Sequence, residues 1–397
     1  MSPLLESEEA ARRLGVKLPT LYAYVSRGLL TSQRAADGKR SLFDLDQIEA
    51  LARRSRGGRQ VDTRLATVTT AITQLRDDGP YYRGQRPADL ATTASYEEVA
   101  ALLWADDRAE WRPRPLAAPA GLSSRDALRW AVVMAGAGDP LRADLRPAAV
   151  VAAAGRLITT MVEALPVTAT GTGPGLTLEG DPSPRPEAVA ARLAARLAPG
   201  PVSAQLVGGI NAALVVLADH ELATSTLAVR MAASTRADLY DAVLAGLGTF
   251  GGPLHGGASQ LVHRLLLDAM EHGAEQAADN ALRWMNVLPG FGHPVYVDGD
   301  PRAQPLLDLF DQLADNGQRA VVDSIRALAD SHHYPAPNVD LGIGALVLAT
   351  GMPADAGQTI FAVARMAGWT AHYLEELVET PLRFRARAIY SHPVAGG

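Results

Sequence analysis

Gly251-Gly-Pro-Leu-His-Gly-Gly-Ala258 is a glycine-rich turn around one histidine, and an apolar helical run, Leu261 to Met270, follows it directly. Glycines beside a histidine let a substrate or another backbone segment approach the ring closely. The start of a helix also offers free N–H groups that suit an anion or a developing oxyanion. His255 is therefore a candidate for chemistry, and the alternative is a turn histidine whose ring is satisfied locally.

Two more histidines lie in unusual surroundings. His220 lies in Leu217-Ala-Asp-His-Glu-Leu-Ala-Thr-Ser-Thr226, and His293 lies in Pro289-Gly-Phe-Gly-His-Pro-Val-Tyr296. A histidine that only closes a turn is the simpler explanation for any one of them. Three histidines in such frames within one chain instead favour a functional site.

An acidic residue, Asp340, lies in Pro337-Asn-Val-Asp-Leu341, just before the apolar run Gly342 to Met352. Asn338 can cap the helix that this run predicts, which places Asp340 in its first turn. Complementation of the helix dipole, worth about 0.3–1 kcal/mol, would explain Asp340 on its own.

Arginines complete the set of candidate site residues. Arg302 follows His293 by nine residues, Arg365 lies inside the apolar run Ile360 to Gly368, and Arg385 lies between Arg383 and Arg387 near the C-terminus. Guanidinium groups hold carboxylates through two hydrogen bonds, so several arginines together indicate a small polycarboxylate ligand. Surface ion pairs are the alternative, which suits Arg383 and Arg387 but suits the apolar setting of Arg365 poorly.

The composition is that of a globular protein with a large core. The 397 residues are 48% hydrophobic and 20% charged, with no cysteine, which excludes disulfides and thiolate catalysis. Ala- and Leu-rich segments with helical periodicity dominate beyond residue 60 and predict a mainly α-helical body. The apolar run from Leu341 is too short to cross a bilayer, and the N-terminus lacks the pattern of a secretion signal. We therefore expect a cytoplasmic protein without a membrane segment.

The first sixty residues form a separate unit in composition. They contain eleven Arg or Lys and seven Asp or Glu residues, whereas the whole chain has a net charge of −6. Short helical patterns at 7–14, 21–27 and 44–54 flank two strand patterns at 29–35 and 39–43. This order resembles the winged helix-turn-helix heads of the excisionase and MerR types.

DNA binding is the function that this head suggests. The candidate recognition helix carries Thr20, Tyr22, Tyr24 and Arg27, and the wing carries Lys39 and Arg40. The alternative is a vestigial or protein-docking module, because the helix has few basic or amide side chains that could contact base edges.

Five motifs follow one another along the rest of the chain: Ala218-Asp-His-Glu221, Gly252-Pro-Leu-His-Gly-Gly-Ala258, Gly290-Phe-Gly-His293 with Asp300-Pro-Arg302, Asn338-Val-Asp340, and Arg385-Ala-Arg-Ala-Ile-Tyr390. In this order, from about Leu75 to Tyr390, the chain resembles the citrate synthase family. The resemblance implies a helical homodimer in which a small domain, residues 256–356, is inserted into a large one. The large domain would comprise residues 61–255 and 357–397, and residues 1–60 would form the head.

The resemblance also implies a role for each candidate residue. Asp340 would remove a proton from the acyl α-carbon, His255 would stabilise the enol, and His293 would protonate the oxaloacetate carbonyl. The residues that would hold oxaloacetate are His220, Arg302, Arg365 and, from across the dimer interface, Arg385 of the partner subunit. Acyl-CoA would be a co-substrate, with no metal and no tightly bound cofactor. The chain departs from the family at Ser259, Pro294 and Val297, where the family commonly has Asn, Arg and Lys.

The sequence therefore predicts a citrate or 2-methylcitrate synthase that condenses acetyl-CoA or propionyl-CoA with oxaloacetate. Two alternatives remain. One is a DNA-binding transcriptional regulator whose synthase-like body senses a carboxylate or an acyl-CoA, and the other is an inert pseudoenzyme.

Overall fold

The computed structural model describes residues 4–7, 10–11, 16, 18–26, 29–34, 41–44, 47–48, 68–76, 78–116, 118–167, 188–296 and 298–384. The chain divides into two units. One comprises Met1–Val68 and Phe384–Gly397, here called the head unit, and the other comprises Thr69–Arg383, here called the body.

The head unit contains one small antiparallel sheet. Its strands β1 (Leu4–Glu6), β2 (Ser32–Arg34) and β3 (Ser41–Asp44) lie in the order β1-β3-β2, and its helix α2 spans Leu18–Ser26. The buried residues of this unit are Ala10, Ala11, Leu21, Leu30, Phe43 and Ile48. The two predicted strands and the second predicted helix are present, whereas β1 was not predicted. The winged helix-turn-helix arrangement as a whole stays a prediction, because most of its first and third helices lies outside the described residues.

The body is mainly α-helical, as predicted, but it begins with a hairpin of β4 (Thr73–Arg76) and β5 (Gly79–Tyr82). Its first helices are α4 (Pro87–Thr93), α5 (Tyr96–Trp104), α6 (Ser124–Ala137), α7 (Pro147–Glu163), α8 (Val189–Leu197), α9 (Ala204–Leu217), α10 (Thr224–Ser234) and α11 (Leu239–Phe250). The helices that follow are α12 (Ala258–His272), α13 (Ala274–Met285), α14 (Ala303–Leu313), α15 (Asn316–Ser331), α16 (Val339–Thr350) and α17 (Ala356–Leu377). None of the described helices combines the length and the apolar character that a bilayer crossing requires.

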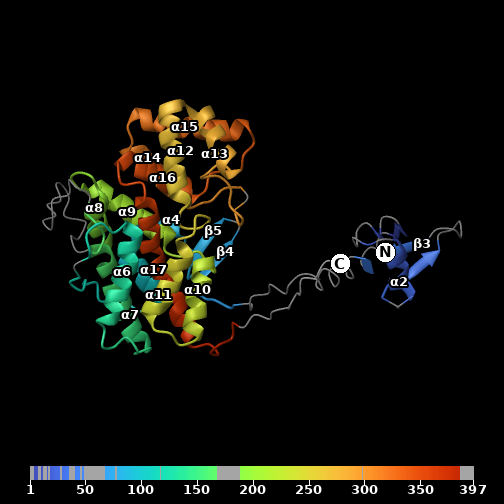
Figure 1. Ribbon diagram of the computed structural model, residues 1–397, viewed down its shortest axis with the longest axis horizontal. Helices are drawn as coiled ribbons and strands as arrows, with labels where there is room; N and C mark the ends of the chain where they lie inside the picture. Colours follow the sequence, from blue (N-terminus) through green and yellow to red (C-terminus); the bar gives the residue numbers. More distant parts are fainter. Residues whose placement is uncertain are drawn as a thin grey trace, which may run out of the picture. The chain divides into compact units, whose positions relative to one another are not determined.

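Helix α17 is the central element of the larger of two cores in the body (Figure 1). It packs against α5, α7, α9, α10 and α11, and its side chains are buried on every face along most of its length. A helix that is apolar all round is stable only when other helices surround it. Two charged side chains of α17, Arg365 and Glu376, are therefore buried in the interior.

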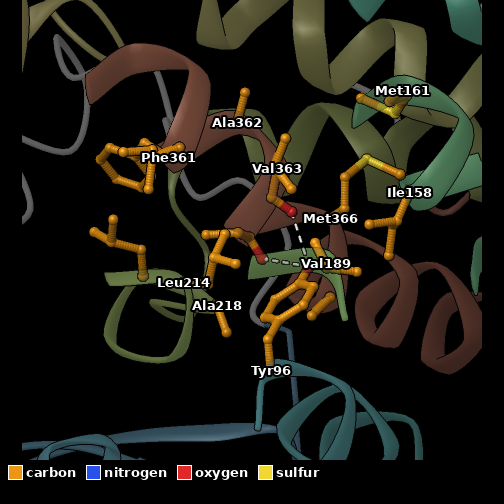
Figure 2. Packing of buried hydrophobic residues seen from close by; sticks show 14 of the residues in the cluster. Tyr96, Ile158, Met161, Val189, Leu214, Ala218, Phe361, Ala362, Val363 and Met366 are labelled. Atoms are coloured by element: carbon orange, nitrogen blue, oxygen red, sulfur yellow. Dashed lines mark hydrogen bonds between the residues drawn. The ribbon is translucent and has the colours of Figure 1, made fainter. Parts of the chain in front are cut away.

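Polar groups inside this core find backbone partners. The hydroxyl of Tyr96 donates to the carbonyl oxygens of Val363, at 2.8 Å, and Ala364, at 3.1 Å, on α17 (Figure 2). The indole of Trp104 donates to Ala367 O at 2.8 Å. Since an unpaired polar group in such a place would cost free energy, these bonds fix the position of α5 against α17.

A second, separate core lies among α12 to α16, at the top of Figure 1. Close approach of these helices depends on glycine: a Cβ at Gly344 would lie 2.5 Å from Val262, and one at Gly342 would lie 2.7 Å from Leu306. The members of this core run from Val262 to Leu348. The predicted boundaries of an inserted small domain, 256 and 356, stay a prediction.

The hairpin of β4 and β5 was not anticipated, because its four-residue strands are too short to show a period-two pattern. It has a structural role at the turn after α9. The hydroxyl of Tyr82, at the end of β5, lies 3.1 Å from Val216 O and 2.9 Å from Asp219 O. The hairpin thereby supports the turn that carries His220.

Candidate active site

Hydrogen bonds from the backbone and the side chain of Asn338 join the turn that carries His293 to the turn that precedes Asp340. Asn338 N donates to Gly290 O and Asn338 Nδ2 donates to Gly292 O, both at 2.9 Å. Gly290 and Gly292 have φ angles of +87° and +81°, which L side chains rarely adopt. The glycines around His293 are thus required by this turn, which lies against the start of α16.

His293, His220 and Tyr296 form a cluster of rings. The His293 and Tyr296 rings stack with centroids 4.7 Å apart, and the His220 ring lies 5.3 Å from that of His293. His220 Nε2 lies 2.9 Å from the hydroxyl of Tyr296. Burial, followed by the charges of Arg302 and Arg365, lowers the pKa of His220 well below its usual range. Burial and Arg302 also lower the pKa of His293, so both rings are neutral at pH 7.

Arg302, just before α14, is buried beside this cluster. Asp300 accepts from its Nε at 2.9 Å and from a terminal nitrogen at 2.7 Å, which is a bidentate ion pair. The same carboxylate accepts from Val339 N at 3.1 Å, at the start of α16. Asp300 thus fixes Arg302 and the beginning of the Asp340 helix together.

Asp340 lies in the first turn of α16, and Asn338 caps this helix, as predicted. Its Oδ1 is enclosed and has no hydrogen-bond partner among the described residues. Burial raises the pKa of Asp340 to about 7; the charge of Arg302 opposes this rise and that of Asp300 adds to it. A carboxylate with a pKa near neutrality can take a proton from a weak carbon acid and release it again.

His255 lies in the turn between α11 and α12. Its Nε2 is 2.8 Å from Ser225 Oγ, and its ring packs edge-on against Phe250 at 5.1 Å. The turn leaves no space for a side chain at Gly256, where a Cβ would lie 2.3 Å from the Phe250 ring. Burial, with a contribution from the charge of Arg365, lowers the pKa of His255 to about 4, so this ring is also neutral at pH 7.

Arg365 is 1% exposed and comes from the middle of α17. Its Nε donates to Leu217 O at 3.1 Å, and its guanidinium carbon lies 5.0 Å from the centroid of the Phe361 ring. One terminal nitrogen is buried without a hydrogen-bond partner among the described residues. Burial lowers the pKa of Arg365, although the charge of Asp219 opposes this. A buried cation with a free donor is suited to bind an anionic ligand.

Six of the seven residues predicted from the sequence for chemistry and carboxylate binding are connected in the structure, either by direct contact or by the effect of one residue's charge on another's pKa. His220, His293 and Arg302 form one contact cluster. The charges of Arg302 and Arg365 act on the pKa values of His220, His255, His293 and Asp340. The seventh residue, Arg385, lies outside the described residues. The assigned roles stay predictions.

Several polar residues of the site were not assigned a role from the sequence. Ser225, Tyr296 and Asp300 all lie within the motif segments that drew attention to the histidines and to Arg302. Their position two to five residues from a candidate was the only signal available. The hydrogen bonds of Ser225 involve His255 and Trp369, which are distant in sequence, so no local sequence pattern indicates them.

The candidate DNA-binding residues are only partly described. Thr20 and Tyr22 are exposed on α2, whereas Tyr24 packs against the small core of the head unit. Arg27, Lys39 and Arg40 lie outside the described residues. Tyr24 is therefore partly buried by packing, and DNA contact by all six residues stays a prediction.

Comparison with known proteins decides the family. The model of the citrate synthase C-terminal domain matches residues 62–387, which is most of the chain. The chain belongs to the citrate synthase family.

Two curated relatives share 37% identity with parts of the chain. Citrate synthase 2 of Bacillus subtilis matches over 200 residues, 49% of this chain and 53% of the relative. 2-Methylcitrate synthase 2 of Corynebacterium glutamicum matches over 169 residues, 41% of this chain and 44% of the relative. The chain thus spans about half the length of these relatives in the matched stretches.

Solved structures of the family share the fold. The citrate synthase of Thermotoga maritima superposes with a TM-score of 0.66 at 24% identity, covering 84% of this chain and 96% of that one. A ternary complex of the Thermoplasma acidophilum enzyme with carboxymethyl coenzyme A and oxaloacetate superposes with a TM-score of 0.64 at 22% identity, covering 86% and 97%.

Proposed function

We propose that the protein is a citrate or 2-methylcitrate synthase that condenses the acyl group of acetyl-CoA or propionyl-CoA with oxaloacetate. The observation that carries the proposal is the carboxylate of Asp340, one oxygen of which is enclosed and whose pKa is raised to about 7. The charge of Arg302 acts on Asp340 and also on the neutral His220 and His293. The named activities of the relatives and the ligands of the Thermoplasma acidophilum complex support it.

Asp340 takes a proton from the acyl α-carbon. The carbanion that results is stabilised as an enol when a neutral imidazole donates a hydrogen bond to the thioester oxygen. His255 suits this role because of its hydrogen bonds. The indole of Trp369 donates to Ser225 Oγ at 3.3 Å, and the Ser225 hydroxyl keeps its own proton to donate. When it donates to His255 Nε2, the proton of the His255 ring is on Nδ1, available to the substrate.

His293 provides the second proton transfer. Its Nδ1 accepts from the backbone nitrogens of Val295, at 3.1 Å, and Tyr296, at 3.3 Å. A ring nitrogen that accepts two N–H groups carries no proton, so the proton of the neutral ring is on Nε2. The nearest guanidinium nitrogen of Arg302 lies 3.4 Å from Nε2, too far to form a strong hydrogen bond that would claim this atom as an acceptor. His293 then protonates the oxaloacetate carbonyl oxygen as the new carbon–carbon bond forms.

Arg302, Arg365 and His220 bind the two carboxylates of oxaloacetate, together with Arg385 of the partner subunit in a homodimer. Water then cleaves the thioester of the condensation product, which releases citrate or 2-methylcitrate and CoA. Both carbons that become bonded belong to the substrates, and none of the residues named above has to act as a metal ligand.

A coupled assay for free thiol tests the proposal. The full chain is mixed with oxaloacetate and either acetyl-CoA or propionyl-CoA, and the expected result is thiol release that requires oxaloacetate. The ratio of kcat/KM for the two acyl-CoAs decides between citrate and 2-methylcitrate synthase. Absence of oxaloacetate-dependent thiol release with both acyl-CoAs, from a folded preparation, would overturn the proposal.

DNA binding by the head unit is a second candidate function, and the observation that favours it is the basic character of residues 1–60 beside an acidic remainder. A dimer would present two heads, so an operator with two half-sites is expected. Selection of bound sequences from a random duplex pool by the full chain tests this. Binding that is weak and independent of sequence at physiological salt would contradict it.

A further inference from the structure

Helix α17 contacts three successive residues of the turn that presents His220, namely Leu217, Ala218 and Asp219. Arg365 Nε donates to Leu217 O at 3.1 Å, and Gly368 N donates to Ala218 O at 3.0 Å. His372 Nε2 lies 3.4 Å from Asp219 Oδ1. Positions 365, 368 and 372 share one face of a helix, so a single helix face supports the turn and also supplies Arg365.

The orientation of His372 follows from its other neighbour. Arg230 on α10 lies with a terminal nitrogen 2.8 Å from His372 Nδ1. A guanidinium group can only donate, so Nδ1 accepts and carries no proton. The proton of His372 is therefore on Nε2, the atom that faces Asp219.

Arg230 is fixed in turn by two acids of α17. Its Nε donates to Glu376 at 2.9 Å, and the terminal nitrogen that faces His372 also donates to Glu375, at 2.6 Å. The side chains of Arg230, His372, Asp219 and Glu376 are all 0% exposed. This chain of buried polar groups runs from the end of α17 to the turn that carries His220.

Asp219 connects this chain to the site residues on both sides of it. Its Oδ2 accepts from Glu221 N at 3.0 Å, and Glu221 has the left-handed φ of +53°. The carboxylate thus closes the turn around His220. Of the charged groups near Arg365, Asp219 also raises the pKa of its guanidinium the most.

The contact between Asp219 and His372 is incomplete. Asp219 Oδ1 and His372 Nε2 are both enclosed, and neither has a hydrogen-bond partner among the described residues. A donor and an acceptor that face each other at 3.4 Å form a full hydrogen bond after an approach of about half an ångström. Binding of substrate carboxylates would draw His220 and Arg365 together. The same movement would bring Asp219 Oδ1 closer to His372 Nε2.

We propose that Asp219 and His372 are positioning residues for carboxylate binding: His372, oriented by Arg230, holds Asp219, and Asp219 sets the positions of His220 and Arg365. The identity of the ligand as oxaloacetate rests on the proposed function. Neither residue touches the substrate. Their effect is on the affinity for the dicarboxylate and not on the proton transfers by Asp340 and His293.

Three variants test this proposal. His372→Leu removes both ring nitrogens, His372→Gln keeps one donor and one acceptor, and Asp219→Asn removes the charge. We expect His372→Leu and Asp219→Asn to raise the KM for oxaloacetate about tenfold to hundredfold, with the KM for acyl-CoA and kcat within about threefold of the wild type. His372→Gln should recover most of the affinity that His372→Leu loses.

Asp139→Asn is the matched control. Asp139 is also a buried carboxylate, 5% exposed, bonded to Tyr240 at 2.6 Å and paired with Arg114 at 3.1 Å, and it shares no described partner with His220 or Arg365. We expect it to lower Tm without changing the KM for oxaloacetate. An Asp219→Asn or His372→Leu protein that raises both KM values in proportion, as a general structural defect would, overturns the proposal.

Calorimetric titration with oxaloacetate alone separates this proposal from that of the enzymatic activity, because it needs no turnover. Weaker binding by His372→Leu, restored in His372→Gln, supports the positioning role even when the wild type releases no thiol. Folded variants that bind oxaloacetate within twofold of the wild type overturn the positioning role, even when the wild type is an active synthase. If Asp219→Asn does not fold, the two His372 variants decide.

Discussion

The hydroxyl of Ser225 lies 2.8 Å from Nε2 of His255. Ser225 is fully buried in the first turn of α10, and Trp369 of α17 donates to the same oxygen. The His255 ring is thus held by α10 through Ser225, and Ser225 is in turn held by α17 through Trp369. A hydroxyl that accepts from an indole and donates to an imidazole determines which ring nitrogen keeps the proton.

Ser225→Ala should therefore lower kcat. Without the hydroxyl, His255 is free to place its proton on Nε2, away from the thioester, and we expect a loss of about tenfold to hundredfold in kcat with little change in the KM for oxaloacetate. Steady-state kinetics with both substrates varied provide the measurement. Thr226→Val is the matched control, because the neighbouring Thr226 hydroxyl is buried without a hydrogen-bond partner among the described residues. Equal losses in the two variants would show that Ser225 does not act through His255.

Asp340 predicts a pH dependence of both activity and stability. The proposed role of Asp340 as a base requires its ionised form, so kcat/KM for acyl-CoA should rise through about pH 7 and then level off. The folded-state pKa is raised above the usual 3.8, so the folded protein binds this proton more tightly than the unfolded chain. The stability that Asp340 contributes is therefore present below about pH 4 and is lost as the pH rises through about 7.

Asp340→Asn tests both parts of that prediction. The variant should lose turnover by more than about a thousandfold, while its free energy of unfolding at pH 8 should exceed that of the wild type by on the order of a few kcal/mol. The stability difference should vanish near pH 4, which urea unfolding across the pH range would show. The assignment of Asp340 as a buried base would be contradicted by a variant that remains active. It would also be contradicted if the stability difference between the variant and the wild type were the same at pH 8 as at pH 4.

The sequence was most informative where local pattern and chemistry coincide. The apolar run after Asn338 predicted both the helix α16 and its cap, and the glycines around His293 and His255 indicated turns that the φ angles and close contacts explain. The residues that hydrogen-bond the rings of His255 and His372 were not predictable from the sequence, because the pairs Ser225–His255 and Arg230–His372 are 30 and 142 residues apart. No periodicity or composition rule specifies which buried side chains meet across helices.

The apolar stretch of α17 shows the same limit. Arg365 was recognised as a misplaced charge in an apolar run, which correctly indicated burial. His372 and Glu376, seven and eleven residues further on, are equally buried, yet they lie near the end of the helix, where polar residues are usually solvated. They are enclosed by α10, by the turn that carries Asp219 and by Arg383, all of which pack against α17.

Gly368→Ala should displace the turn that carries His220. A Cβ at Gly368 would lie 2.2 Å from Asp219 Oδ1 and 2.6 Å from Ala218 O, so α17 and the turn must separate. We expect the KM for oxaloacetate to rise at least about tenfold, with a loss of stability of about 1–3 kcal/mol. The measurements are steady-state kinetics and thermal unfolding.

Gly208→Ala is the control for this substitution. Gly208 lies in α9, where a Cβ would meet nothing within 4 Å. Replacing a helical glycine by alanine at an open position should stabilise the protein by about 0.5–1 kcal/mol and leave kinetics unchanged. Unaltered oxaloacetate affinity in Gly368→Ala would mean that the turn has another way to accommodate the methyl group and that its contact with α17 does not set the affinity.

Arg385 should act across the dimer interface, and subunit mixing can show this. Arg385→Ala and Asp340→Ala homodimers should each be nearly inactive. In a mixed dimer, the site with Asp340 intact would receive Arg385 of the partner subunit and be complete, whereas the other site would lack both. Random exchange of equal amounts should therefore restore about a quarter of the wild-type activity. If Arg385 instead acts within its own subunit, neither site of the mixed dimer is complete, and mixing restores no activity although exchange is confirmed by tagged subunits.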